Sequence, residues 1–217
     1  MPAAMSNPDL LEEYILRHID EEPALLRKIH RETHLKLLHG TMVSGHLQGR
    51  LLKMLVQMIR PSRVLEVGTY TGYSALCIAE GLDEGGELHT LEIDDELEEM
   101  IRYHFSQSPL GERITLHIGD AQVLLPRFED AFFDLAFLDG DKRSYWQIYE
   151  ATLPKVKHGG FLLADNSLWH GKIMETTLPA DRQTQGIQEF NERLADDLRV
   201  EKVIVPLRDG LTLIRKK

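Results

Sequence analysis

Cysteine and long apolar runs are the features that this sequence most clearly lacks. Cys77 is the only cysteine, so no disulfide can form within the chain. Apolar runs are short and interrupted by charged residues, which excludes a membrane-spanning helix. The N-terminal stretch has no basic segment followed by an apolar one, the pattern of a signal peptide. These absences predict a soluble, cytoplasmic protein without a membrane partner.

Basic charge is also in short supply. The chain has 25 Lys and Arg against 35 Asp and Glu, a formal net charge of −10. A broad basic surface is what attracts nucleic acid, so nucleic acid is not an expected partner. The length of 217 residues and the hydrophobic fraction of 42% are ordinary for one globular unit. We therefore expect a single domain over residues 1–217.

Hydrophobic periodicity divides that domain into a helical N-terminal cap, residues 1–60, and an α/β core, residues 61–217. Before Pro61, apolar residues recur at helical spacing. After it, short apolar runs alternate with helical stretches, an order that predicts a parallel sheet with helices on both faces. The expected strands are 64–67, 88–93, 114–118, 133–138 and 161–164, and the expected helices are 72–81, 95–106, 121–127 and 142–153.

The C-terminal part has a different pattern. A helix predicted at 183–197 is followed by two apolar runs, 200–206 and 211–215. Asp209 and Gly210 lie between these runs, and an Asp-Gly pair in that position is a strong signal for a hairpin. The sheet should therefore be mostly parallel, with an antiparallel last strand.

A glycine-rich turn follows the first predicted strand and contains Gly68 and Gly72. Glycine lets the chain turn tightly and lets a ligand approach the backbone. Ligands of open α/β sheets bind outside the carboxyl ends of the strands, where this turn lies. Its G-x-x-x-G spacing lacks the full G-x-G-x-x-G dinucleotide fingerprint, so a ligand without a pyrophosphate fits it better.

Polar residues also follow the second and third predicted strands. Glu92 lies roughly twenty residues after the glycine turn, where a carboxylate can accept hydrogen bonds from ribose hydroxyls. We assign Glu92 to that role and the two aspartates, Asp94 and Asp95, to capping the next helix. Gly119 permits close approach of an adenine ring. Asp120 either accepts a hydrogen bond from the adenine amino group or caps the helix that follows.

The fourth and fifth predicted strands end in Asp139 and in Asp165-Asn166. Neighbouring strand ends would bring these three side chains together. Two carboxylates and one amide oxygen form a hard, all-oxygen ligand set that suits Mg²⁺, with Mn²⁺ or Ca²⁺ as alternatives. No cysteine or histidine joins the set, which disfavours zinc. About three positions of an octahedron would stay open for substrate and water.

These motifs carry a family resemblance. The stretches LEVGTYTGYSALCIAEGL, TLEID, FDLAFLDGDKRSY and GGFLLADNSLWHGK resemble the caffeoyl-CoA and catechol O-methyltransferase family of metal-dependent class I methyltransferases. The resemblance extends over residues 41–217. It implies a Rossmann-like class I methyltransferase fold with a seven-stranded sheet, S-adenosylmethionine as the cofactor and a homodimer.

The resemblance also implies roles for individual residues. Asp139, Asp165 and Asn166 resemble the family's metal ligands, and Lys142 resembles its catalytic lysine. Asp139 is expected to be a catalytic residue as well. The residues expected to contact S-adenosylmethionine are Met42, Glu66, Gly68, Tyr70, Ser74, Glu92, Gly119, Asp120, Ala121 and Asp139.

The expected function is transfer of a methyl group from S-adenosylmethionine to a metal-activated hydroxyl of a small phenolic, catechol-like substrate. A tRNA hydroxyuridine O-methyltransferase is an alternative, and it would require a basic groove at the metal site. An NAD-dependent oxidoreductase would require the missing dinucleotide fingerprint and would leave Asp165 and Asn166 without a task. A non-enzymatic metal- or nucleotide-binding module, which would bind S-adenosylmethionine without turnover, is a third alternative. The sequence does not identify the acceptor.

Overall fold

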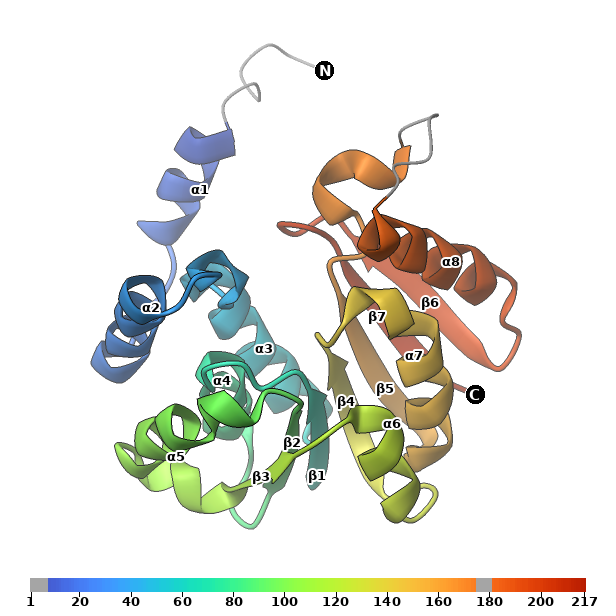
Figure 1. Ribbon diagram of the computed structural model, residues 1–217, viewed down its shortest axis with the longest axis horizontal. Coiled ribbons are helices and arrows are strands. Elements are labelled where there is room, and N and C mark those ends of the chain that lie inside the picture. The colour runs from blue at the N-terminus through green and yellow to red at the C-terminus, as the bar shows by residue number, and fades with distance from the viewer. Residues whose placement is uncertain (1–7, 175–180) are drawn as a thin grey trace.

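A seven-stranded sheet forms the centre of the molecule, shown in Figure 1 as a computed structural model that describes residues 8–174 and 181–217. The strand order is β3-β2-β1-β4-β5-β7-β6. The strands are β1 (Arg63–Val67), β2 (Glu87–Glu92), β3 (Ile114–Ile118), β4 (Phe133–Leu138), β5 (Val156–Asp165), β6 (Val200–Val205) and β7 (Leu211–Lys216). The seven strands form the mostly parallel sheet that the sequence predicts.

Strand directions explain where a ligand site can form. β1 pairs in parallel with β2 and β4, and the parallel pairing continues to β3 and β5. β7 is antiparallel to both β5 and β6, so the predicted hairpin and antiparallel last strand are confirmed. The carboxyl ends of β1 to β5 therefore lie along one edge, and loops from different parts of the sequence meet there.

Helices cover both faces of the sheet (Figure 1). α3, α4 and α5 contribute to one core cluster, and α6, α7 and α8 to the other. α1 and α2 precede them at the N-terminal side. The helices in the described residues are α1 (Pro8–Leu16), α2 (Ala24–Lys36), α3 (His46–Ile59), α4 (Tyr73–Gly81), α5 (Glu98–Ser106), α6 (Ala121–Leu124), α7 (Tyr145–Thr152) and α8 (Arg182–Asp196). None of them is long and apolar enough to cross a membrane.

Three predicted helices are shorter than expected. The helix predicted at 95–106 begins with the 3-10 turn η3 (Asp95–Leu97) before α5. The helix predicted at 121–127 ends as α6 at Leu124 and continues as the 3-10 turn η5 (Leu125–Arg127), in which Pro126 lacks the N–H that an α-helix needs. The helix predicted at 142–153 begins with the 3-10 turn η6 (Lys142–Ser144) before α7. That turn places Lys142 just beyond the end of β4.

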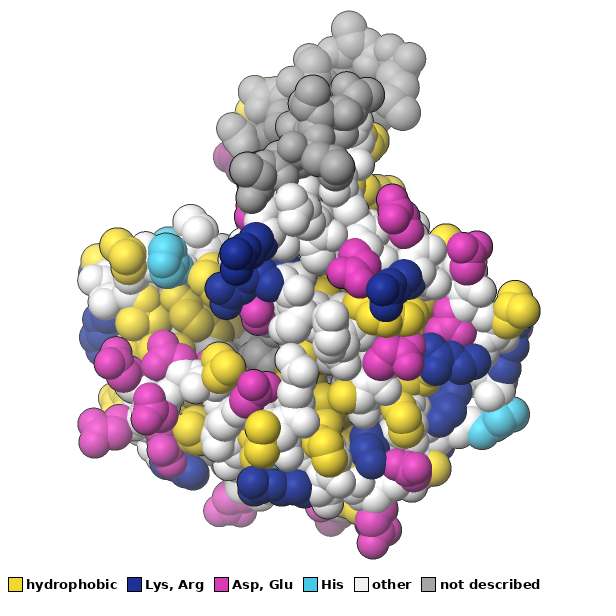
Figure 2. All heavy atoms as spheres, turned by 45° about the vertical axis from the view of Figure 1, so that its right-hand side comes forward, with side chains coloured by type: hydrophobic (Ala, Val, Ile, Leu, Met, Phe, Trp, Pro, Cys, Tyr) yellow, Lys and Arg dark blue, Asp and Glu magenta, His cyan; other side chains and the backbone are white. Residues whose placement is uncertain are grey.

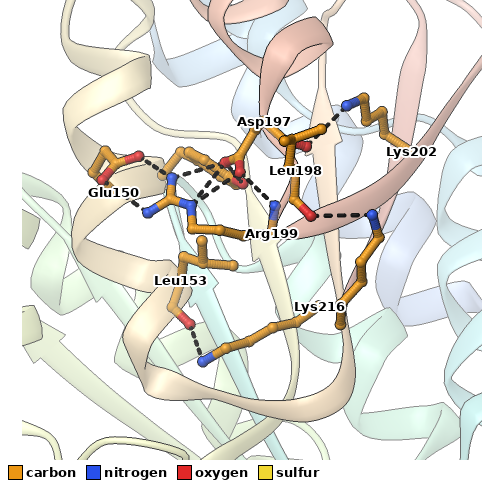
Figure 3. A network of polar contacts seen from close by, with 9 residues as sticks. Glu150, Leu153, Asp197, Leu198, Arg199, Lys202 and Lys216 are labelled. Atoms are coloured by element: carbon orange, nitrogen blue, oxygen red, sulfur yellow. Dashed lines mark hydrogen bonds and ion pairs between the residues drawn. The ribbon is translucent and has the colours of Figure 1, made fainter.

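A polar network fixes the corner where α8 leads into β6 (Figure 3). The Tyr149 hydroxyl of α7 donates to Asp197 Oδ2 over 2.7 Å. Arg199 Nε donates to Asp197 Oδ1 over 2.9 Å, and its guanidinium also pairs with Glu150. The Arg199 guanidinium holds the pKa of Asp197 down at about 2. The network ties α7, α8 and β6 to one another on the face opposite α3 to α5.

Charges of both signs are interspersed on the face seen in Figure 2, with hydrophobic side chains between them. No extended area of one sign is visible on that face. A basic stripe of the kind that steers proteins to nucleic acid is not seen on the described residues of this face.

Candidate active site

Two acidic side chains lie side by side at the carboxyl edge of the sheet. The β4–β5 register pairs Leu138 with Ala164, so Asp139 and Asp165 occupy the next position on adjacent strands. Asp165 is 6% exposed. The charges of the two carboxylates interact. The prediction that neighbouring strand ends would bring these residues together therefore agrees with the geometry.

Asp139 forms an ion pair with the lysine of the next turn. Lys142 Nζ lies 2.8 Å from Asp139 Oδ1 and 4.6 Å from the centre of the Tyr145 ring. Lys142 is 7% exposed. Burial raises the pKa of Asp139, while the Lys142 ammonium opposes this and the charge of Asp165 adds to it. Lys142, Asp139 and Asp165 thus form a compact group of one basic and two acidic side chains.

Gly186 allows this lysine turn to be covered. A Cβ at Gly186 would lie 2.0 Å from the Lys142 carbonyl oxygen, which no side chain can do. The absence of a side chain lets α8 pack directly against η6, and this packing helps to bury Lys142.

Asp165 and Asn166 are held in place by backbone and aromatic contacts. Asp165 Oδ1 accepts a hydrogen bond from the Asn166 N–H over 2.8 Å. The Tyr145 hydroxyl lies 2.7 Å from the Leu138 carbonyl oxygen and 2.8 Å from that of Asp165, so it joins the ends of β4 and β5. Asn166 has φ 62, in the left-handed region.

The amide of Asn166 is available to a ligand, since its side chain bonds no residue that the structure describes. The described residues contain no group of three or more His, Cys, Asp or Glu side chains that could hold a metal ion. A cation site here therefore depends on the Asn166 oxygen as the third protein ligand. Two carboxylates and an amide oxygen fit a hard cation such as Mg²⁺.

Gln48 and Arg208 extend the site in a way that the sequence did not predict. Gln48 lies on α3, is 4% exposed, and donates from Nε2 to Asp165 Oδ2 over 2.6 Å. Arg208 lies in the turn between β6 and β7 and donates from Nη1 to Gln48 Oε1 over 2.7 Å. Three distant parts of the chain are thus joined by a series of hydrogen bonds that ends at the Asp165 carboxylate.

The glycine turn after β1 lies beside this acidic pair. Gly68 has φ 103, and a Cβ there would lie 2.5 Å from the Asp139 carbonyl oxygen. The sequence suggested glycine for the approach of a ligand, whereas the structure gives a reason within the protein: the loop after β4 occupies the space. The turn is consequently in direct contact with the backbone of Asp139.

Glu66, at the same strand end, is a buried carboxyl group with one unused oxygen. It is fully buried, and its Oε2 accepts from the Thr90 hydroxyl over 2.5 Å. Its Oε1 has no hydrogen-bond partner among the described residues. Burial raises the pKa of Glu66 to about 8, against the opposing effect of the Ser74 and Thr90 hydroxyls. An unpartnered buried acceptor of this kind fits a ligand that brings a donor, such as an ammonium group.

Glu92 links the glycine turn to the end of β2. Its Oε2 accepts from the Tyr70 N–H over 2.6 Å, and its Oε1 accepts from the Asp94 N–H over 2.9 Å. Burial raises the pKa of Glu92 while these backbone N–H groups lower it. Each carboxylate oxygen keeps a further lone pair for a ligand hydroxyl. Asp94 caps the following turn through the Glu96 N–H, as predicted.

The remaining predicted cofactor contacts lie around the same edge. Ser74 is in the first turn of α4, and Gly119 follows β3 with φ 143. Asp120 Oδ1 accepts from the Gln122 N–H over 2.8 Å, so the helix-capping alternative is observed for Asp120. Ala121 begins α6, next to that cap.

Met42 approaches the glycine turn from the N-terminal part of the chain. It ends the 3-10 turn η2 (Gly40–Met42) and is 62% exposed. The Tyr70 hydroxyl donates to the His39 carbonyl oxygen over 3.0 Å, which fixes η2 beside the glycine turn. An exposed methionine in this place can cover an apolar ligand surface.

Three residues that build the site escaped the sequence-based prediction, namely Gln48, Tyr145 and Arg208. Gln48 carried a usable signal, because it precedes the buried Leu52 and Val56 at four-residue spacing and is therefore a polar residue on the core-facing side of α3. Tyr145 and Arg208 gave none, since tyrosine at a helix start and arginine beside an Asp-Gly turn are ordinary.

Comparisons with known proteins identify the family of this chain. A sequence profile described as O-methyltransferase matches residues 17–217. Catechol O-methyltransferase domain-containing protein 1 of Mus musculus is 34% identical over 211 residues, 95% of this chain and 79% of the relative. Caffeoyl-CoA O-methyltransferase of Petroselinum crispum is 31% identical over 223 residues, 96% of this chain and 91% of the relative.

Solved structures of methyltransferases have the same fold as this chain. The SAH-bound methyltransferase PaMTH1 of Podospora anserina superposes with a TM-score of 0.90 at 27% identity, over 100% of this chain and 98% of that one. The O-methyltransferase TomG of Streptomyces achromogenes, in complex with SAM, gives 0.86 at 26% identity, over 100% and 99%. The fold is that of the class I methyltransferases. The chain belongs to the O-methyltransferase family.

Proposed function

We propose that this protein transfers the methyl group of S-adenosylmethionine to a hydroxyl of a small catechol-like acceptor, with a divalent cation, Mg²⁺ foremost, held by Asp139, Asp165 and Asn166. The reaction forms a bond from oxygen to the methyl carbon, breaks the carbon–sulfur bond of the donor, and releases S-adenosylhomocysteine and a proton. The observation that carries the proposal is the meeting of Asp139 and Asp165 beside the Gly68 turn.

The donor side of the proposal rests on buried acceptors along the strand ends. Glu66 Oε1, which lacks a partner, would accept from the ammonium group of the donor. Glu92 would accept from the ribose hydroxyls with the lone pairs that Tyr70 and Asp94 leave open. Met42, Gly68, Tyr70, Ser74, Gly119, Asp120 and Ala121 would complete the contacts.

The acceptor side rests on the acidic pair and the lysine. A phenolic hydroxyl has a pKa of about 10, and a bound divalent cation would lower it toward neutrality. Asp139, Asp165 and Asn166 would hold that cation, and through it they would orient the hydroxyl-bearing end of the acceptor. Lys142 Nζ, 2.8 Å from Asp139, would either take the proton or stabilise the oxyanion electrostatically. The protein's main contribution is alignment of oxygen, methyl carbon and sulfur.

The decisive test is methyl transfer from labelled S-adenosylmethionine to catechols, caffeoyl esters and bulk tRNA, with and without EDTA. We expect turnover on a vicinal diol, its loss on chelation and in Asp165→Ala, and slow turnover with donor binding retained in Lys142→Ala. Asp130→Ala is the matched control, because Asp130 is an exposed carboxylate paired with Lys155. Turnover that ignores EDTA would refute the metal assignment, and turnover on tRNA alone would establish the alternative substrate class.

The family match favours methyl transfer over the hydride transfer of an oxidoreductase. The homodimer and the cytoplasmic location stay predictions.

A further inference from the structure

Arg208 occupies an unusual place for a long charged side chain. It lies in the turn between β6 and β7 with φ 47, in the left-handed region. Glycine adopts this conformation freely, whereas a residue with a Cβ is strained there. Strain of this kind points to function when the side chain is put to use.

The turn that carries Arg208 is fixed against the loop that follows β5. The Leu168 N–H donates to the Asp209 carbonyl oxygen over 2.6 Å, and the Ser167 N–H donates to that of Gly210 over 3.1 Å. His170 Nδ1 lies 2.9 Å from Asp209 Oδ1. Because Ser167 and Leu168 directly follow Asn166, the turn is anchored beside the proposed ligands.

The side-chain amide of Gln48 links the guanidinium of Arg208 to the carboxylate of Asp165. Its Nη1 is 2.7 Å from Gln48 Oε1, and Gln48 Nε2 is 2.6 Å from Asp165 Oδ2. With the width of the amide added, Nη1 lies within about 8 Å of the Asp165 carboxylate.

Arg208 forms no direct ion pair in the described part of the chain, where no carboxylate oxygen lies within 4.0 Å of its guanidinium nitrogens. Its charge does act on the Asp139 carboxylate, without direct contact. Arg50 and Arg60, in contrast, each pair with an acidic residue. Gln48 uses one of the five N–H donors of Arg208. Donors in a planar fork remain, and that fork matches the two oxygens of a carboxylate.

We propose that Arg208 binds a carboxylate group of the acceptor, so that the enzyme prefers catechols bearing a carboxylate to neutral or cationic ones. This inference rests on the proposed function, since it places the acceptor hydroxyls at Asp139 and Asp165. It adds the chemical class of the acceptor and makes Arg208 the residue that determines specificity.

A purely structural role of Arg208 makes a different prediction. If the guanidinium only orients Gln48, and Gln48 only orients Asp165, then loss of Arg208 slows methylation of every acceptor by the same factor. If it binds the acceptor, the loss depends on the charge that the acceptor carries. The ratio of two acceptors therefore separates the two roles.

The experiment measures kcat/KM for three catechols: protocatechuate, which carries a carboxylate, methylcatechol, which is neutral, and dopamine, which carries an ammonium group. The variant is Arg208→Gly, which removes the guanidinium and relieves the backbone, so loss of folding is not expected. Arg60→Gly is the matched control. Arg60 is also an arginine in the left-handed region, φ 53, and its guanidinium pairs with the exposed Asp83.

In Arg208→Gly we expect the protocatechuate-to-methylcatechol ratio of kcat/KM to fall roughly tenfold or more, and the dopamine-to-methylcatechol ratio to rise. Arg208→Lys, which keeps the charge without the fork, should fall between. Arg60→Gly should leave both ratios at the wild-type value. An equal loss for all three acceptors, or no change in the ratios, overturns the inference.

Failure of the proposed function is distinguishable from failure of this inference. If the wild-type protein methylates none of the three catechols, the proposed function fails. Carboxylate recognition is then judged by calorimetric titration of protocatechuate into the protein saturated with S-adenosylhomocysteine and Mg²⁺. Binding that is lost in Arg208→Gly and kept in Arg60→Gly upholds it, and equal binding by both variants, or none by the wild type, overturns it.

Discussion

Replacement of Glu66 by glutamine should stabilise the cofactor-free protein increasingly as the pH rises. Glu66 is fully buried, and burial raises its pKa from 4.5 to about 8. Between these values the folded protein keeps the carboxyl group protonated while the unfolded chain ionises it. Folding then takes up a proton, so this group's contribution to stability falls as the pH rises through that window.

The size of the effect follows from the same shift. Each pH unit above 4.5 lowers the free energy of unfolding by about 1.4 kcal/mol until the folded pKa is reached. Near pH 7.5 the cost is about 4 kcal/mol on this scale, and relaxation of the site would reduce it to about 2–4 kcal/mol. Glutamine has the same shape and no charge to lose, so Glu66→Gln should escape this cost.

Urea denaturation of both proteins near pH 5 and near pH 8 measures the effect. The free energy of unfolding of Glu66→Gln minus that of the wild type should grow by about 2–4 kcal/mol between the two conditions. Glu80→Gln is the matched control. The pKa of Glu80 lies below its ordinary value through hydrogen bonds from Arg50 and Lys53, against the effect of burial, so its difference should not grow. A Glu66→Gln difference that is the same at both pH values refutes the reasoning.

Binding of the methyl donor, S-adenosylmethionine, should shift Glu66 from its protonated to its ionised form. An ammonium group bound at Glu66 favours the ionised carboxylate, so S-adenosylmethionine binding below about pH 8 should release a proton. Titration calorimetry in two buffers of different ionisation enthalpy would detect that proton. Glu66→Gln should bind the donor roughly tenfold or more weakly, and unchanged affinity would remove Glu66 from the donor site.

Two further predictions concern stability. Asp197→Asn removes the charge that Arg199 binds and should cost about 1–3 kcal/mol near pH 7. The Arg199 interaction lowers the pKa of Asp197 from 3.8 to about 2. The stability that this interaction contributes is therefore present above pH 3.8 and is lost as the pH falls toward 2. An equal cost of Asp197→Asn in urea denaturation near pH 7 and near pH 3 would contradict this reasoning. Burial lowers the pKa of both His89 and His117 from 6.5, and their nitrogens are 3.0 Å apart. The stability that these two neutral histidines contribute is therefore present above pH 6.5 and is lost as the pH falls below it. His89→Phe should flatten the acid side of the plot of melting temperature against pH. A steeper loss in the variant would speak against buried neutral histidines.

The alternation of strands and helices was predictable because it depends on the local periodicity of hydrophobic residues. Strands such as β3 (Ile114–Ile118) and β4 (Phe133–Leu138) have the predicted bounds, since buried parallel strands read as continuous apolar runs. The acidic residues at strand ends were predictable for a related reason. A residue that follows a parallel strand lies at the carboxyl edge whatever the rest of the fold does.

The sequence alone determined the class of fold, the edge of the sheet at which the candidate site lies and the candidate oxygen ligands, because each depends on residues close together along the chain. Only the tertiary structure decided that Gln48 bonds Asp165, that Arg208 bonds Gln48, and that Glu66 keeps an unpartnered oxygen. Gln48 and Arg208 are 160 positions apart, and nothing in local pattern relates them. Burial and long-range contact, which set the charge and partners of each group, come only from packing the whole chain.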